Sequence, residues 1–296
     1  MIVERPRDLF WKKLAAHTFL ICFIALILFP FLIVLSISLR PGNFSTGSLI
    51  PNPISFEHWS LALGIPFTTP DGTVLQPPFP VMLWLFNSIK IGTIASAGIL
   101  VLSMTAAYAF SRLQVRGRAA ILDALLIIQM FPAALTVIAL YTIFDALGNV
   151  TPILGVDSHW SLIIAYLSGI TLHIWTIKGY FDSIDPAMDK AAEIDGATPW
   201  QTFRLVLLPM SVPILAVVFV LSFIGHVTEY PVASVLLRET NNMTLAVGAR
   251  SYLYEQRYLW GDFAAAAILS GLPITAVFLL AQRFLVSGLS DGGVKG

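Results

Sequence analysis

Long apolar stretches alternate with short polar segments along this chain of 296 residues. A helix that crosses a bilayer needs about 20 mostly apolar residues, and six stretches reach that length. To within a few residues they are 14–38, 85–110, 119–144, 159–178, 208–230 and 263–286. The fourth stretch is the weakest, because it is diluted by small or polar residues, namely Ser168, Gly169, Thr171 and His173. The pattern predicts an all-α membrane protein with six transmembrane helices, organised as one membrane domain over residues 1–296.

The basic residues between these stretches predict the orientation, because Lys and Arg accumulate on the cytoplasmic side of a membrane protein. Twelve fall on one side: Arg5, Arg7, Lys12, Lys13, Arg112, Arg116, Arg118, Lys178, Lys190, Arg204, Arg283 and Lys295. Five fall on the other: Arg40, Lys90, Arg238, Arg250 and Arg257. We therefore expect both termini and the loop 179–207 to be cytoplasmic, and the segments 39–84 and 231–262 to be outer loops.

The two outer segments differ in character. Residues 40–84 hold eight prolines, and proline removes a backbone donor and blocks helix interiors, so we expect irregular or sheet-edge structure there and no span. Residues 231–262 mix aromatic and arginine side chains. That mixture suits either a hydrated protein–protein contact or an aromatic belt at the bilayer surface.

Composition narrows the class of protein. The chain is 57% hydrophobic and 11% charged, against about 25% charged in an ordinary soluble domain. Its net charge is zero, so no nucleic-acid partner is expected. The single cysteine, Cys22, excludes an internal disulfide framework. There is no phosphate-loop, zinc-protease or serine-nucleophile motif. We therefore expect a non-catalytic chain that binds no cofactor or metal.

The polar loop 179–207 contains the signals of a short helix. Asp185 is a good N-cap and Pro186 a good first residue, while Gly196 stands where a helix end favours positive φ. With residues placed 100° apart, one face is polar. The other is apolar and consists of Ala187, Met188, Ala191, Ala192 and Ile194.

A second helix is predicted directly after the first. Thr198 is a candidate N-cap, Pro199 the first helical residue, and Gln201 completes the spacing of a capping box. The expected order is helix, glycine hinge, helix and then the fifth span. A force on the first helix can therefore reach the membrane through the second.

These residues carry a family resemblance. The run Lys190-Ala191-Ala192-x-x-x-Gly196, followed after nine residues by Val206-x-Leu208-Pro209, resembles the EAA loop of ABC-importer membrane subunits. That resemblance implies the type I permease fold and a coupling helix that docks on an ATPase subunit. The family usually has an acid where this chain has Lys190. The implied ATPase-coupling residues are Asp189, Lys190, Ala191, Ala192, Glu193, Gly196, Leu208 and Pro209.

The resemblance extends over nearly the whole chain, through the segments 38–51, 177–181, 196–201, 260–266 and 292–296. They are similar to the smaller membrane subunits of maltose/maltodextrin importers. The resemblance implies a heterodimer with a larger permease subunit, two copies of a cytoplasmic ATPase that binds ATP and Mg, and an extracytoplasmic sugar-binding protein. It also implies a multi-pass protein of the bacterial inner membrane, in contact with lipid.

Two further sites follow from the resemblance alone. The last outer loop of the family contacts the binding protein, and the matching residues are Tyr252, Leu253, Tyr254, Glu255, Gln256 and Arg257, although the sequence departs from the family there. The glycine-rich tail of the family extends between the ATPase subunits. The matching residues are Gly292, Gly293, Val294, Lys295 and Gly296.

Two other functions are compatible with an apolar chain. A secondary transporter driven by an ion gradient would require paired intramembrane acids, and Asp123 alone is a plausible mid-span acid. A membrane scaffold or enzyme would require a catalytic motif or an added domain. Polar residues within or beside the spans are candidates either for sugar contact or for helix–helix hydrogen bonds: Lys90, Gln129, His173, His226 and Glu229.

Overall fold

The computed structural model describes residues 6–254 and 257–292. They form two compact units, Met1–Pro80 with Ala249–Ile268 and Val81–Gly248 with Leu269–Gly296. The chain is mostly helical, and its only strands in the described residues form two short hairpins. The all-α class is thereby confirmed.

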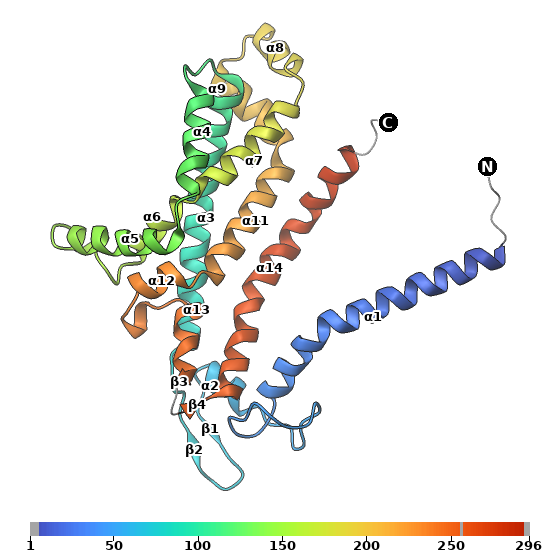
Figure 1. The fold of residues 1–296 in the computed structure, drawn as a ribbon, viewed down its shortest axis with the longest axis vertical. Helices are drawn as coiled ribbons and strands as arrows, with labels where there is room; N and C mark the ends of the chain where they lie inside the picture. Colours follow the sequence, from blue (N-terminus) through green and yellow to red (C-terminus); the bar gives the residue numbers. More distant parts are fainter. Residues whose placement is uncertain (1–5, 255–256, 293–296) are drawn as a thin grey trace. The chain divides into compact units, whose positions relative to one another are not determined.

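The first unit joins the start of the chain to a segment near its end (Figure 1). Its two hairpins are antiparallel, with Phe67 opposite Leu75 in one and Leu253 opposite Tyr258 in the other. The unit contains α1 (Pro6–Ser38), α2 (Glu57–Ala62), β1 (Phe67–Thr68), β2 (Val74–Leu75), η4 (Ala249–Tyr252), β3 (Leu253–Tyr254), β4 (Arg257–Tyr258) and the start of α14 (Trp260–Gly292).

A buried polar cluster joins the two chain segments of this unit. The His58 ring donates from Nδ1 to the Asp262 carboxylate at 2.6 Å and from Nε2 to the Gly42 carbonyl oxygen at 3.1 Å. Both partners can only accept, so the protonated imidazolium is the form that satisfies both contacts. Burial alone would lower the pKa of His58, but Asp262, the Glu57 charge and the Gly42 carbonyl together raise it above its ordinary value.

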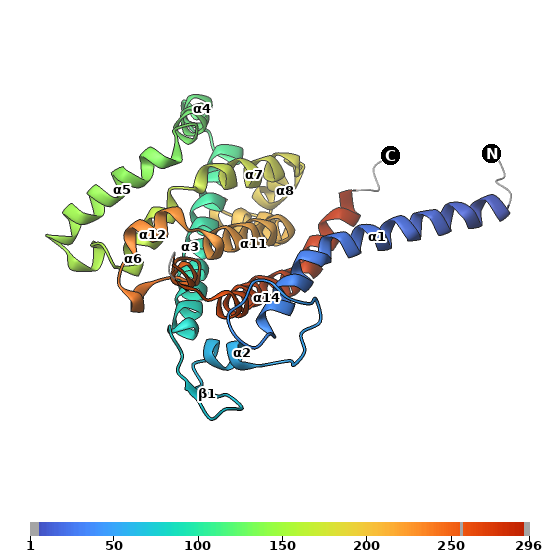
Figure 2. The same ribbon diagram turned by 60° about the horizontal axis from the view of Figure 1, so that its bottom comes forward.

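The second unit contains most of the helices, and α3 is at its centre. Figure 2 shows α7 and α11 beside α3, and both pack along it. The unit contains α3 (Val81–Arg112), α4 (Arg118–Gln129), α5 (Ala133–Gly148), η1 (Pro152–Leu154), α6 (His159–Leu167), α7 (Ile170–Ser183), α8 (Ala187–Ile194), α9 (Pro199–Thr202), η2 (Phe203–Leu207), α10 (Leu208–Met210), α11 (Val212–Thr228), α12 (Pro231–Leu236), η3 (Thr240–Asn242), α13 (Leu245–Gly248) and the rest of α14.

Two apolar cores hold this unit together. One includes Ile91 of α3, Phe144 of α5 and Leu162 of α6. The other lies where α3 ends and includes residues of α3, α7, η2 and α11 together with Ile184, just beyond α7: Ala107, Ile177, Phe181, Ile184, Phe203, Leu207, Leu215 and Val218. Because the second core contains Phe203 and Leu207, it ties the end of the polar loop to α3, α7 and α11.

Three helices are long and apolar enough to cross a membrane, namely Phe10–Ser38, Val81–Arg112 and Trp260–Phe284. They correspond to the first, second and sixth predicted stretches. Two more stretches are bent pairs, His159–Leu167 with Ile170–Ser183 at 47° and Pro199–Met210 with Val212–Thr228 at 75°.

The stretch 119–144 does not form one helix. It is divided into α4 and α5 by a break at residues 130–132. Pro132 has no N–H to donate and disfavours helical backbone at the preceding residue, so it ends one helix and precedes the next. The proline-rich segment 40–84 is irregular over most of its length and contains the first hairpin, as well as the short helix α2, which was not predicted.

The protonated His58 makes the stability of the first unit depend on pH. Because its folded-state pKa is raised, the stabilisation is fully present below the unfolded value of about 6.5 and is lost as pH rises through the folded value. We expect the melting temperature of the purified protein to fall as the pH is raised above about 6.5. His58→Gln should flatten this profile and cost about 1–3 kcal/mol, because a buried acceptor loses its donor.

The matched control is His17→Gln, because His17 is exposed on α1. It should keep the wild-type slope. An equal slope in wild-type and His58→Gln protein would contradict the assignment of the proton to His58.

Candidate functional site

The first helix of the polar loop has both predicted caps. The Asp185 carboxylate accepts a hydrogen bond from the Ala187 N–H at 2.9 Å. At the other end Gly196 has φ of +83°, and the N–H groups of Gly196 and Ala197 donate back to the carbonyls of Glu193 and Ala192. This pair of backbone hydrogen bonds is the Schellman motif, which requires a residue in the left-handed conformation at the end of the helix. The predicted positive-φ glycine at the end of this helix is therefore confirmed.

The second helix begins with the predicted capping box. The Thr198 hydroxyl accepts from the Gln201 N–H at 3.3 Å, and the Gln201 side chain accepts from the Thr198 N–H at 2.7 Å. Two otherwise free backbone donors are thus satisfied within four residues. We refer to α8 and α9 below as the loop helices; both lie at one end of α3 (Figure 1).

The connection from the loop helices to the span is bent more strongly than the sequence indicated. A π-helical turn, η2, follows α9, and the axis then turns by 75° into α11. The bend is centred on the buried Ser211, whose hydroxyl donates to the Leu207 carbonyl at 2.7 Å. Pro209 and Pro213 on either side remove two backbone donors, and this was the sequence signal for the bend. The predicted coupling residues Leu208 and Pro209 lie at this bend.

Buried side chains next to the loop helices attach these helices to the end of α3. Phe203 and Leu207 are fully buried. The Tyr108 ring packs on Phe203 with centroids 4.7 Å apart, and its hydroxyl donates to the Pro199 carbonyl at 2.9 Å. The loop helices are therefore anchored on a packed core and are not a free surface loop.

The loop helices also expose large apolar side chains. Ile194 is 86% exposed, Trp200 61% and Met188 43%, and Ala191 is also exposed. Exposed apolar groups on a polar segment are typical of a protein contact. The apolar face predicted for α8 thus includes solvent-facing residues, whereas Trp200 was not among the predicted site residues. The sequence signal that could have identified Trp200 was its position in the first turn of α9, close to the N-cap Thr198.

The charged residues of α8 divide into two groups. Lys190 and Glu193 are exposed. Asp189 instead contacts Arg112 at the end of α3, with 2.6 Å between the guanidinium Nε and the carboxylate Oδ2. Burial raises the pKa of Asp189, and the nearby Glu193 adds to this, while Arg112 opposes it. Sequence reasoning missed Arg112, because it lies 77 positions before Asp189.

The predicted contact loop forms the second hairpin of the first unit. Tyr252 is buried, and its ring meets that of Phe79 edge-on with centroids 4.9 Å apart. Leu253 is half-buried and Tyr254 is exposed. Glu255 and Gln256 lie outside the described residues, as do four of the five predicted tail residues, namely Gly293, Val294, Lys295 and Gly296. Gly292 is the last residue of α14.

Polar side chains within the spans make helix–helix hydrogen bonds. His226 pairs with Ser96 at 3.0 Å and His173 with Ser222 at 3.1 Å. Glu229 accepts from the Tyr166 hydroxyl at 2.8 Å and also from backbone N–H groups at the start of α12. These contacts favour the helix-packing interpretation over direct sugar contact for all three candidates. Asp123 and Gln129 are exposed on α4.

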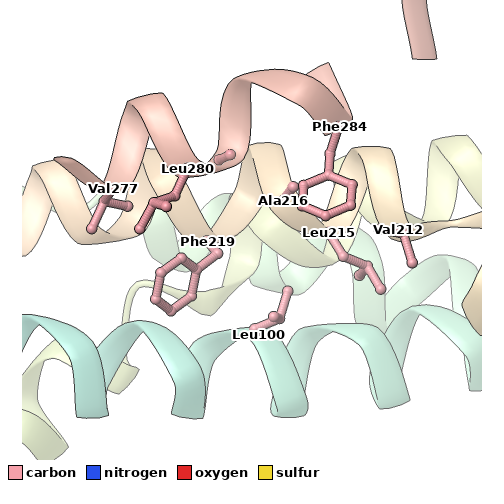
Figure 3. Close-up of a pocket in the computed structure, with 9 residues that line it drawn as sticks. Leu100, Val212, Leu215, Ala216, Phe219, Val277, Leu280 and Phe284 are labelled. Atoms are coloured by element: carbon pink, nitrogen blue, oxygen red, sulfur yellow. The ribbon is translucent and has the colours of Figure 1, made fainter. Parts of the chain in front are cut away.

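An apolar groove of about 360 Å³ lies in the second unit among residues of α3, α11 and α14 (Figure 3). Its lining is Leu100, Val212, Leu215, Ala216, Phe219, Val277, Leu280, Ala281 and Phe284. No side chain in this set can donate or accept a hydrogen bond, so a sugar placed there would lose its hydration without replacement. The groove therefore does not fit a carbohydrate site.

Comparisons with known proteins agree on one family. Residues 99–291 match the family model described as the binding-protein-dependent transport system inner membrane component. The chain is 62% identical over its 296 residues to the maltose/maltodextrin transport system permease protein MalG of Photorhabdus laumondii, all of which it covers. It is 61% identical to MalG of Yersinia pestis, covering 98% of that protein, and 58% identical to MalG of Escherichia coli K12, covering all of it.

Solved structures show the same fold. A bacterial ABC transporter involved in the import of the acidic polysaccharide alginate matches with a TM-score of 0.74 at 21% identity, over 96% of this chain and 99% of that one. The MetNI methionine ABC transporter in an inward-facing conformation matches with a TM-score of 0.54 at 14% identity, over 70% and 97%. The helices of this chain therefore have the fold of ABC importer permeases.

Two threonines four residues apart test the capping geometry. The Thr198 hydroxyl caps α9, whereas the buried Thr202 hydroxyl has no hydrogen-bond partner among the described residues. Thr198→Val should destabilise α9 by about 1 kcal/mol, which speeds amide hydrogen exchange over residues 198–203. Thr202→Val replaces an unsatisfied buried hydroxyl with a methyl group of similar shape. It should leave the rate of amide exchange unchanged or lower it. Faster exchange in Thr202→Val than in Thr198→Val would contradict the assignment.

Proposed function

Because the chain belongs to the family of binding-protein-dependent transport system inner membrane components, we propose that it is the permease subunit of an ATP-driven importer of maltose and maltodextrins. The chain would form half of the translocation path, and a larger permease subunit would form the other half. Membership of this family makes the chain a non-catalytic component of a transport system.

The observation that carries the choice of sugar is the 62% identity to a maltose/maltodextrin permease over the full length of both chains. The likeness to the alginate importer supports the fold alone. A maltodextrin is large and polar, and a path for it needs polar groups on both sides. The apolar groove of this chain offers none, which is consistent with a partner that supplies much of the sugar contact.

The proposed topology has six spans in one membrane domain over residues 1–296, with both termini in the cytoplasm. Five spans correspond to the three long helices and the two bent pairs. The remaining span, which is the third along the chain, would consist of α4 and α5. The excess of basic residues on the side of loop 179–207 supports the orientation. The segments 39–84 and 231–262 would then face the outside.

In the proposed mechanism the loop helices couple ATP to transport. Two copies of a cytoplasmic ATPase would bind ATP and Mg, and closure of their dimer would move α8. The capped turn at Gly196 passes this motion to α9, and the core around Phe203 and Leu207 passes it to the spans. The proposed coupling residues are Asp189, Lys190, Ala191, Ala192, Glu193, Gly196, Leu208 and Pro209, to which we add Ile194 and Trp200 for their exposure.

On the outside, an extracytoplasmic sugar-binding protein would deliver the ligand. The proposed contact segment is Tyr252–Arg257, in which Tyr254 is exposed and Tyr252 is buried as a support. On the inside, the tail Gly292–Gly296 would extend between the ATPase subunits.

An ion-driven transporter remains the second candidate in principle. It would need paired acids within the membrane, whereas Asp123 stands alone on the exposed side of α4. Glu229 is occupied in capping α12. The family match also favours the ATP-driven alternative.

Affinity purification from solubilised native membranes tests the proposal. The chain should bring down a larger membrane subunit and a subunit that hydrolyses ATP. Changing both Ala191 and Ala192 to Glu should abolish recovery of the ATPase, because two charges would enter an apolar contact. The matched control changes Gln114 and Arg116 to Glu, since both are exposed in the connection between α3 and α4 and lie outside the proposed spans. A solitary protein without ATPase activity would overturn the proposal and favour the ion-driven alternative.

The glycine hinge makes a second prediction. Gly196 has positive φ, and a Cβ there would meet no atom within 4 Å, so substitutions act through backbone strain and not through a clash. Gly196→Val should cost about 1–2 kcal/mol at the hinge and reduce sugar-stimulated ATP hydrolysis in the assembled complex. Gly196→Asn should be milder, because Asn tolerates this conformation.

The control is Gly179→Val on α7. That glycine also has open space around it but no positive φ. Normal stimulation in an assembled Gly196→Val complex, or equal losses at positions 179 and 196, would contradict a role for the hinge in coupling.

A further inference from the structure

The last two turns of α3 hold both loop helices. Tyr108 and Arg112 are four residues apart and therefore lie on the same face of α3. Tyr108 donates to the carbonyl of Pro199 at the start of α9. Arg112 contacts Asp189 of α8. One face of one span thus contacts both helices that the proposed mechanism moves.

Arg112 connects the end of α3 both to α8 and to the residue just beyond α7. Its Nε lies 2.6 Å from the Asp189 carboxylate, and its Nη2 donates to the Ile184 carbonyl at 2.9 Å, just beyond the end of α7. The side chain of Arg112 is 12% exposed and that of Asp189 is 15% exposed. A charge pair withdrawn from water to this extent is screened far less than a surface pair, and breaking it leaves an unpaired charge.

Asp182 also interacts electrostatically with Arg112, but its hydrogen bonds are made to other side chains. Asp182 is held by Lys178 at 2.6 Å and by the Ser111 hydroxyl at 2.6 Å. Glu193, on the next turn of α8, is exposed. Asp189 is therefore the acid that α8 directs toward α3, while Lys190 and Glu193 remain available to a partner.

We infer that Asp189 acts within the chain, and that the Arg112–Asp189 pair is a positioning contact that transmits movement of α8 directly to α3. This inference rests on the proposed function. The covalent route from α8 to the membrane passes through the Gly196 hinge and the 75° bend at Ser211, so this route alone does not fix the orientation of α8 relative to α3. The second attachment fixes the orientation of α8 relative to α3, and α3 packs along both α7 and α11.

The test uses the complete complex in proteoliposomes with three variants, Arg112→Glu, Asp189→Arg and the double charge swap. Two quantities are measured: ATP hydrolysis stimulated by the sugar-loaded binding protein, and sugar uptake. Docking is followed separately by cross-linking Ile194→Cys to the ATPase in a Cys22→Ser background. Arg116→Glu serves as the control, because Arg116 is exposed beyond the end of α3.

Each single charge reversal should lower stimulated hydrolysis and uptake by about tenfold, since like charges then face each other in a partly buried contact. The cross-link from residue 194 should persist, because the exposed docking face is untouched. The double swap should recover activity relative to both single variants, although the contact with the Ile184 carbonyl is lost. Arg116→Glu should behave as wild type.

The inference is overturned if the single variants retain full stimulation, if the swap is no better than the worse single variant, or if the cross-link disappears together with activity. The last outcome would mean that the pair shapes the docking face. These outcomes require a wild-type complex that responds to the binding protein. A wild-type chain without any associated, sugar-stimulated ATPase would instead overturn the proposed function.

Discussion

The structure depends on one constraint: in a hydrocarbon environment each backbone N–H and C=O must find its partner within the protein. Helices satisfy it, and serine side chains add hydrogen bonds where a helix changes direction. At the bend before α11 the Leu207 carbonyl accepts from both the N–H and the hydroxyl of Ser211. After α6 the Ala165 carbonyl accepts from both the N–H and the hydroxyl of Ser168. Each serine thus gives a carbonyl at the change of direction a second donor.

The loop helices meet the same constraint by a different route, because their ends face water and each other. A Schellman ending closes α8 and a capping box opens α9, with the Gly196 hinge between them. Two short helices would be marginal in isolation. They are stabilised here by Phe203 and Leu207 in the core below and by the polar contacts of Tyr108 and Arg112. The surface that we propose to contact the ATPase is thereby fixed to α3.

Features encoded within a few residues could be predicted from the sequence. The caps at Asp185, Gly196 and Thr198 depend on neighbours at most five positions away, and all were confirmed. Features that depend on distant residues could not be predicted. The Arg112–Asp189 pair joins α3 to α8, and the burial of Tyr252 depends on Phe79, far earlier in the chain. The division of stretch 119–144 falls between these cases, since Pro132 was visible but membrane helices often tolerate a proline.

The 75° bend at Ser211 has a geometric consequence for the energy of movement. When two rigid rods meet nearly at right angles, displacement along one becomes mostly sideways displacement of the other. In the proposed mechanism, a push along α9 would therefore translate α11 mostly sideways and would hardly move it along its own axis. A translation within the plane of the bilayer leaves the depth of every side chain in the membrane unchanged. A piston stroke would drag the polar residues at the span ends through hydrocarbon, at a cost of several kcal/mol for each buried polar group.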